Sequence, residues 1–167
     1  MNLIKEFNDK KFSIFSKENF YSTLLILLLF LADRISKNII IKNFSENIYY
    51  INEFINFDLI WNTGIGFGFF SSSTSLLYNV LTLVIGAIIL LLLYITLMSE
   101  KNKDKIIYSM ITGGALGNFY DRFVFTAVPD FIDIHYNNFH WFTFNIADIF
   151  ISLGVILLII TGLQIKN

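Results

Sequence analysis

Long apolar stretches alternate with polar segments along the chain. Each stretch has the ~20 residues that a helix needs to cross the hydrocarbon core of a bilayer. The pattern therefore predicts four membrane-spanning helices, at about residues 21–41, 76–98, 105–125 and 145–165. Residues 42–75 and 126–144 are expected to form the two longer loops that connect them.

The four stretches differ in the charges that they contain. Residues 76–98 contain none, and residues 145–165 contain only Asp148, close to their start. The other two contain several charges near one end, and we interpret them as spans because their remaining lengths are apolar. No small-x-small cleavage pattern follows the first stretch, so we expect it to remain uncleaved.

The two expected loops have patterns of their own. Residues 48–62 mix aromatic and polar residues with alternation, which predicts a short β-hairpin or ribbon. The aromatic run at residues 139–142 is typical of side chains that lie at the level of the lipid headgroups.

Basic residues are distributed unequally between the polar segments. Only Lys42 lies in an expected outer loop, whereas eight of the 12 basic residues lie on the other side, at Lys5, Lys10, Lys11, Lys17, Lys101, Lys103, Lys105 and Lys166. Because cytoplasmic loops carry the excess of lysine and arginine, both termini are predicted to face the cytoplasm. The loops at residues 42–75 and 126–144 would then face outward.

Composition supports a membrane protein built as one domain of 167 residues. Hydrophobic residues make up 55% of the chain and charged residues 15%, and a soluble domain of this size could not bury so much apolar surface. The net charge of −1 indicates no nucleic-acid partner. The absence of cysteine excludes thiolate chemistry and cysteine-bound metals, and His135 and His140 have no third ligand nearby in sequence, so we expect no metal site.

The polar residues within the stretches fall at one depth. At ~1.5 Å of rise per residue they all lie in the outer third of the bilayer. They also share helix faces, as i,i+3 or i,i+4 neighbours within three of the stretches: Asp33 and Lys37; Gly114, Asn118 and Arg122; Asn145 and Asp148. A charged group inside a membrane is a candidate functional residue, so this zone is the candidate site.

Several of these residues also have a structural interpretation. Asp33 and Lys37 could be only an ion pair that the membrane tolerates, or could shape the site. The glycines at residues 113–117 favour close helix packing. A proton-coupled carrier or a non-catalytic scaffold would also place polar residues in a membrane, although a carrier should have them through its full depth.

Two carboxylates suggest a reaction. Asp148 lies near a helix N-terminus, which stabilises its ionised form, and Asp130 lies among apolar neighbours that raise the pKa of a carboxyl group. If the two approach each other, they share one proton and titrate together. One can then take a proton from water while the other donates to a carbonyl oxygen, which is the chemistry of an aspartic peptidase.

Four motifs in this order resemble the bacterial lipoprotein signal peptidase (signal peptidase II) family. They are Asp33-Arg34-Ile35-Ser36-Lys37, Asn62-Thr63-Gly64, residues 113–122 (GGALGNFYDR), and residues 128–132 (VPDFI) with 144–148 (FNIAD). The likeness extends over about residues 22–165. Pro129, Gly66 and residues 140–143 depart from the pattern usual in the family.

The resemblance implies four transmembrane helices with a small extracytoplasmic β-hairpin or cradle and a short amphipathic loop segment, an otherwise all-α membrane protein. It implies an aspartic endopeptidase in the bacterial inner membrane that cuts diacylglyceryl-modified prolipoproteins before the lipidated cysteine. Asp130 and Asp148 would be the catalytic pair. Supporting or substrate-binding residues would be Asp33, Lys37, Asn62, Gly114, Asn118, Arg122 and Asn145. We expect a monomer among membrane lipids, without cofactor or metal.

Overall fold

The computed structural model describes residues 15–64 and 74–164. The predicted orientation depends partly on lysines that lie outside this part, namely Lys5, Lys10, Lys11 and Lys166. Gly66 lies outside it as well. Within it the elements follow in the order α2 (Lys17–Asn43), β1 (Tyr49–Asn52), β2 (Ile55–Asn62), α3 (Thr74–Met98), α4 (Asn102–Phe125), β3 (Val128–Tyr136), β4 (Phe139–Phe144) and α5 (Ile146–Gln164).

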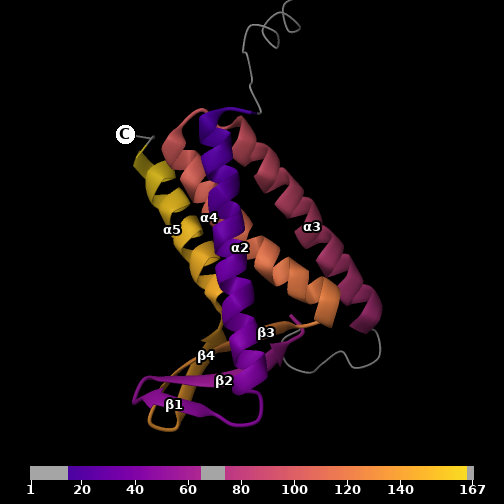
Figure 1. Cartoon of the computed structure of the whole chain (residues 1–167), viewed down its shortest axis with the longest axis vertical. Helices are drawn as coiled ribbons and strands as arrows, with labels where there is room; N and C mark the ends of the chain where they lie inside the picture. Colours follow the sequence, from indigo (N-terminus) through magenta and orange to yellow (C-terminus); the bar gives the residue numbers. More distant parts are fainter. Residues whose placement is uncertain (1–14, 65–73, 165–167) are drawn as a thin grey trace, which may run out of the picture.

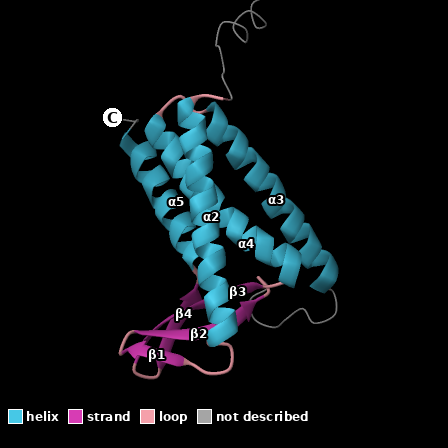
Figure 2. Ribbon diagram, viewed as in Figure 1, coloured by secondary structure: helices cyan, strands magenta, loops and turns pink. Residues whose placement is uncertain are grey.

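The helices stand side by side, and the sheet lies across one end of the bundle (Figures 1 and 2). α4 packs against α2, α3 and α5, so it is the central helix. α2 begins and α5 ends at the end of the bundle that is far from the sheet (Figure 1). The start of α2 and the end of α5 are therefore on the same side of the bundle.

The sheet is larger than the sequence pattern predicts. The expected hairpin is present as β1 and β2, but residues 128–144, expected as loop, contribute β3 and β4 to an antiparallel sheet with the order β1-β2-β3-β4. The label all-α is therefore incomplete, and the aromatic run at residues 139–142 belongs to a strand. Aromatic residues occupy both faces of β4, so the strand has no clear polar and apolar alternation to reveal it.

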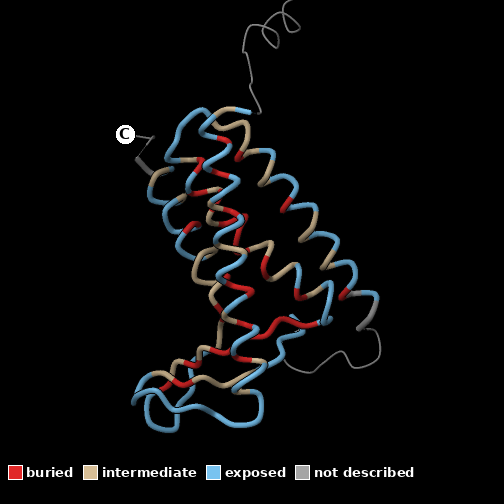
Figure 3. The backbone as a smooth tube through the Cα atoms, viewed as in Figure 1, coloured by how far each residue is buried: buried red, intermediate tan, exposed pale blue. Residues whose placement is uncertain are grey.

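Figure 3 marks the buried and the exposed positions of the bundle: charged and polar side chains are buried beside apolar ones, whereas many of the exposed side chains are large and apolar. Lys37, Asp33, Asp121 and Asn145 are each 0% exposed, whereas large apolar side chains project outward from the helices, among them Leu83, Leu90, Ile88, Phe123 and Ile156. Water would penalise this arrangement and lipid would favour it.

Glycines allow α4 to approach its neighbours closely. A Cβ at Gly114 would lie 2.5 Å from the carbonyl oxygen of Ala147 on α5, and a Cβ at Gly113 would lie 2.9 Å from the Cβ of Leu29 on α2. Real Cβ atoms do not approach so closely, so only glycine fits at these positions. This confirms the expected packing role of the glycines in residues 113–117.

Among the described helices, one stretch is long and apolar enough by itself to cross a membrane, Tyr78–Met98 of α3. A shorter apolar stretch, Ile146–Gly162, forms most of α5. α2 and α4 carry the charged residues of the interior, which lower their apolar character. The four helices are present close to the expected ranges, and their passage through a membrane stays a prediction.

Candidate active site

The N-terminus of α5 is built by two of the expected site residues. Asn145 precedes the helix, and its side-chain Oδ1 accepts a hydrogen bond from the backbone N–H of Asp148 at 3.0 Å. In return the backbone N–H of Asn145 donates to Asp148 Oδ2 at 3.1 Å. This reciprocal pair is a capping box, which satisfies N–H groups that a helix start leaves without partners. It fixes the carboxylate of Asp148 at the start of α5.

Asp130 reaches the same place from the sheet. It is the third residue of β3 and lies opposite Ile60 on β2, so Asn62 is a diagonal neighbour across the strand pair. The Asn62 side chain donates to Asp130 Oδ2 at 2.9 Å. Asn62 is itself held by a turn, in which its Oδ1 accepts from the N–H of Gly64 at 2.7 Å and Gly64 adopts a φ of +74° that favours glycine.

Asn145 links the two carboxylates. While its backbone N–H binds Asp148, its side-chain Nδ2 donates to Asp130 Oδ1 at 2.6 Å. The pKa of Asp130 is raised to about 6, mainly by burial and also by the charge of Asp148, against the lowering effect of the hydrogen bonds from Asn62 and Asn145. A carboxyl with this pKa can hold or release a proton near neutral pH.

A buried set of side chains on α2 and α4 supports Asp148 from the other side. Asn118 donates from Nδ2 to Asp148 Oδ1 at 2.8 Å, and its Oδ1 accepts from Lys37 Nζ at 2.9 Å. Lys37 Nζ also donates to Asp33 Oδ2 at 2.8 Å. Asp33 Oδ1 in turn accepts from the backbone N–H of Ala147, in the first turn of α5, at 3.0 Å. Asp33 and Lys37 therefore form an ion pair that also contacts the candidate site.

Two charged residues that the sequence analysis did not select complete this set. Asp121 Oδ2 accepts from Lys37 Nζ at 2.7 Å, and Asp121 Oδ1 lies 2.6 Å from Arg34 Nη1. Both residues lie within expected spans. They are far apart in the chain, however, so no i,i+3 or i,i+4 spacing could indicate that Arg34 and Asp121 form a pair.

Arg122 lies beside the turn at the end of β2. A Cβ at Gly64 would be 3.2 Å from Arg122 Nη2, and the Arg122 carbonyl accepts from the Tyr78 hydroxyl at 3.1 Å. Its Nε and Nη1 are buried and have no hydrogen-bond partner among the described residues. Arg122 thus adjoins the turn that holds Asn62, with donors left available.

The structure therefore gathers the expected residues at one end of the bundle. Asp130, Asp148, Asn62, Asn118 and Asn145 form one hydrogen-bonded set; Asp33 and Lys37 join it, and Gly114 and Arg122 lie at its borders. A cavity beside Asp148 is lined mainly by apolar side chains of β4 and α5, namely Phe142, Phe144, Ile149 and Leu153, with Ser152. Paired carboxyl groups beside an apolar opening suit proton transfer on a substrate that arrives from lipid.

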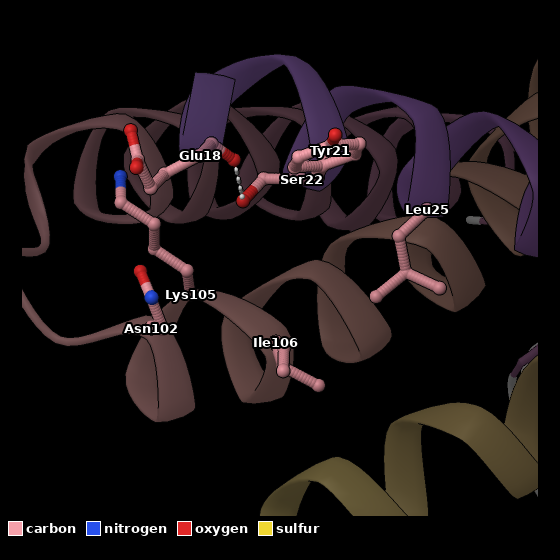
Figure 4. A pocket seen from close by; sticks show the side chains of 7 residues that line it. All are labelled: Glu18, Tyr21, Ser22, Leu25, Asn102, Lys105 and Ile106. Carbon is pink, nitrogen blue, oxygen red and sulfur yellow. Dashed lines mark hydrogen bonds between the residues drawn. The ribbon is translucent and has the colours of Figure 1, made fainter. Parts of the chain in front are cut away.

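A second cavity lies at the opposite end of the bundle. It is lined by side chains from the first turns of α2 and α4, including Glu18, Tyr21 and Lys105 (Figure 4). The Lys105 ammonium already donates to the Asn19 side chain and to the carbonyl oxygens of Thr96 and Leu97. This lysine therefore joins the ends of α2, α3 and α4 that are far from the sheet.

Known proteins resemble the chain over nearly its whole length. The model of the family described as signal peptidase (SPase) II matches residues 25–164. The lipoprotein signal peptidase of Pelagibacter ubique is 48% identical over 155 residues, covering 90% of this chain and 92% of that protein. The lipoprotein signal peptidase of Thermodesulfovibrio yellowstonii is 35% identical over 144 residues, covering 86% and 95%.

The fold is also similar to solved structures. One, described as a bacterial membrane enzyme structure at 1.9 Å resolution, matches with a TM-score of 0.71 and 29% identity, covering 86% of this chain and 93% of that chain. Another bacterial membrane enzyme structure, at 2.3 Å resolution, matches with the same TM-score and 28% identity, covering 88% and 90%.

Proposed function

This chain belongs to the signal peptidase II family, and we infer that it removes signal peptides from diacylglyceryl-modified prolipoproteins by cutting before the lipidated cysteine. The family is one of peptidases, so the resemblance seen in the sequence motifs is confirmed and the chain is an enzyme.

The proposed reaction is hydrolysis by a water molecule held between Asp130 and Asp148. The pair shares one proton. The ionised carboxylate takes a proton from water as the water oxygen bonds to the peptide carbonyl carbon, and the protonated carboxyl donates to the carbonyl oxygen. The tetrahedral intermediate then collapses: the carboxyl that took the proton from water gives it to the leaving nitrogen as the C–N bond breaks, and the other carboxylate takes a proton from a hydroxyl of the intermediate, which restores the singly protonated pair. The pair acts as a unit, so neither residue is assigned a fixed role.

The observation that carries this proposal is the position of Asn145 between the carboxylates. Its side chain binds Asp130 at 2.6 Å and its backbone N–H binds Asp148 at 3.1 Å. Two acids from different elements are thereby held together at the end of a bundle, and the pKa of Asp130 is raised to about 6. If the two carboxylates were purely structural, a cation would be expected between them. Asp130 and Asp148 are instead held by the neutral amide groups of asparagines.

We further propose that all four helices cross the inner membrane, with both termini in the cytoplasm and the site at the outer face. The apolar outer surface of the helices and the polar interior support this arrangement. The site lies where the sheet meets the bundle, so a lipid-anchored peptide in the outer leaflet could reach it while its acyl chains stay in the membrane.

The decisive experiment uses purified protein in detergent and a diacylglyceryl-modified prolipoprotein. Asp130→Asn and Asp148→Asn should each lower the cleavage rate by ~10³-fold or more, because each removes a proton-transfer group. Asp58→Asn, which changes a carboxyl group elsewhere in the sheet, is the matched control and should cleave at the wild-type rate.

Membrane insertion of the variants is measured in parallel. Inserted but inactive Asp130→Asn protein distinguishes a peptidase from a carrier or a scaffold. Substantial turnover by either variant would show that the pair is not catalytic, and absence of cleavage by the wild-type protein would refute the proposed substrate.

A further inference from the structure

Four charged side chains are buried together beside the candidate site. Asp33, Lys37 and Asp121 are each 0% exposed, and Arg34 is 8% exposed. Lys37 Nζ contacts both carboxylates, at 2.8 Å and 2.7 Å, and Arg34 lies 2.6 Å from Asp121 Oδ1 and 3.5 Å from Asp33 Oδ2. Two positive and two negative charges make this cluster neutral.

The cluster is connected to Asp148 through one amide. Lys37 Nζ has three protons, and the structure uses them for Asp33, Asp121 and Asn118 Oδ1. Because the oxygen of Asn118 is bound to Lys37, its Nδ2 is directed at Asp148. The orientation of Asn118 therefore depends on Lys37 keeping its hydrogen bonds to Asp33, Asp121 and Asn118 together.

We propose that Arg34 is a positioning residue for the reaction: by neutralising Asp121 it keeps Lys37 available to Asn118, which in turn holds Asp148 in place. This inference rests on the proposed function. Arg34 contacts neither reacting carboxylate in the described contacts; its effect passes through Asp121 and Lys37.

Removal of the Arg34 charge has a specific consequence. Asp33 and Asp121 would then share a single cation, and the buried cluster would carry one uncompensated negative charge. Asp121 would compete more strongly for Lys37 and draw it away from Asn118. Arg34 also lies over the ring of Tyr120, 4.8 Å from its centre, a contact that holds the guanidinium in place.

The uncompensated negative charge would also act on Asp130, the second carboxyl group of the proposed pair. The charges that act on Asp130 are those of Asp148 on α5 and Lys37 on α2. Lys37 is paired in turn with Asp33 and Asp121, the two carboxylates that Arg34 adjoins. Added negative charge in this set disfavours ionisation of its carboxyl groups. Loss of Arg34 should therefore change how activity depends on pH, in addition to its maximum.

The test compares three variants of the full chain on the lipidated prolipoprotein. Arg34→Met should lower kcat by ~10- to 100-fold, the range expected for a displaced supporting group, with KM changed by less than about threefold. Its acidic limb of kcat/KM should move to higher pH. Arg34→Lys restores the charge and should return that limb toward the wild-type position.

The double variant Arg34→Met/Asp121→Asn separates charge balance from packing. It removes one charge of each sign, leaves Asp33 paired with Lys37, and should recover most of the kcat that Arg34→Met loses. Lys42→Met, at an exposed position in the last turn of the same helix, removes an equal charge outside the cluster and should behave as wild type.

The outcomes separate the two proposals. Wild-type kcat and an unmoved pH limb in Arg34→Met, with Asp130→Asn inactive, would refute the positioning role and leave the peptidase intact. A double variant as impaired as Arg34→Met would refute the charge-balance explanation. The same conclusion holds if Arg34→Met does not fold and the double variant is equally defective. A wild-type protein that cleaves no prolipoprotein would refute the proposed function and this inference with it.

Discussion

At the scale of single residues, Asn145 combines structural and chemical tasks. Its Oδ1 and backbone N–H complete the cap of α5 with Asp148, and its Nδ2 binds Asp130. The same residue therefore begins a helix and sets the spacing of two acids. Substitution can separate these two tasks. The cap of α5 needs a side-chain acceptor at this position, whereas the contact with Asp130 needs a side-chain donor.

Asn145→Ser and Asn145→Ala should differ in stability but agree in activity. Serine caps a helix about as well as asparagine, whereas alanine costs ~1 kcal/mol. Both lose the Nδ2 donor to Asp130, so both should lower kcat/KM by ~100-fold. Thermal unfolding and prolipoprotein cleavage, measured on the same preparations, test this. Equal melting temperatures for the two variants would contradict the capping role.

The raised pKa of Asp130 predicts a pH dependence of folding. Its pKa is about 6 in the folded protein against an ordinary value of 3.8, so the folded state binds more protons between these values. The contribution of Asp130 to the free energy of unfolding should fall as pH rises from about 4 to 6, by up to about 3 kcal/mol.

Asp130→Asn cannot titrate and should lack this fall. Unfolding of the wild type and this variant, followed from pH 4 to pH 8, gives the difference between the two curves. The difference should shift in favour of Asp130→Asn as pH rises. A constant difference would show that Asp130 has an ordinary pKa.

At the scale of elements, the position of α5 depends on its contact with α4. Gly114 faces the carbonyl oxygen of Ala147, one residue before Asp148, so the spacing of the two helices and the placement of the acid are set together. A change in this contact must move the start of α5 relative to Asn118 and β3.

Gly114→Ala should therefore impair both stability and activity. The added Cβ would lie 2.5 Å from that oxygen and 2.9 Å from Ile151 Cγ1, which forces the helices apart at a cost of ~1–3 kcal/mol. Gly162→Ala is the matched control, because a Cβ there meets no atom within 4 Å. Unfolding and cleavage assays should show loss only for Gly114→Ala; equal behaviour would refute the close-packing explanation.

Some of these elements could be predicted from the sequence and others could not. The helices were predictable because their apolar runs have the length of a bilayer, and the hairpin at residues 48–62 because its residues alternate. β4 was not, since neighbouring Phe142 and Trp141 are both apolar and the strand has no polar face. The pairing of Arg34 with Asp121 was equally hidden, because only the packing of α2 on α4 brings two distant charges together.

At the scale of the whole molecule, the distribution of polarity indicates an orientation. The sheet and the candidate site share one end of the bundle, and the α3–α4 connection lies at the other (Figure 2). This connection contains Lys101, and Lys103 follows in the first turn of α4. Lysine-rich connections face the cytoplasm, so the sheet is predicted to face outward.

Single cysteines can test this orientation, because the chain contains none of its own. Asn138→Cys, in the turn between β3 and β4, should react with a membrane-impermeant maleimide added to intact spheroplasts. Lys101→Cys should react only after the membrane is permeabilised. The opposite pattern would invert the predicted topology, and both variants should retain cleavage as evidence of a native fold.

The contacts of the N-terminus of α5 have a consequence for biosynthesis. Asp33 belongs to α2, Asn118 to α4 and Asp148 to α5, and all three meet around one helix start. A ribosome delivers these parts in order, so the proposed catalytic pair can be supported in this way only after α5 has been synthesised. An unfinished chain therefore lacks the assembled candidate site, and translation itself should postpone hydrolysis until α5 has been made.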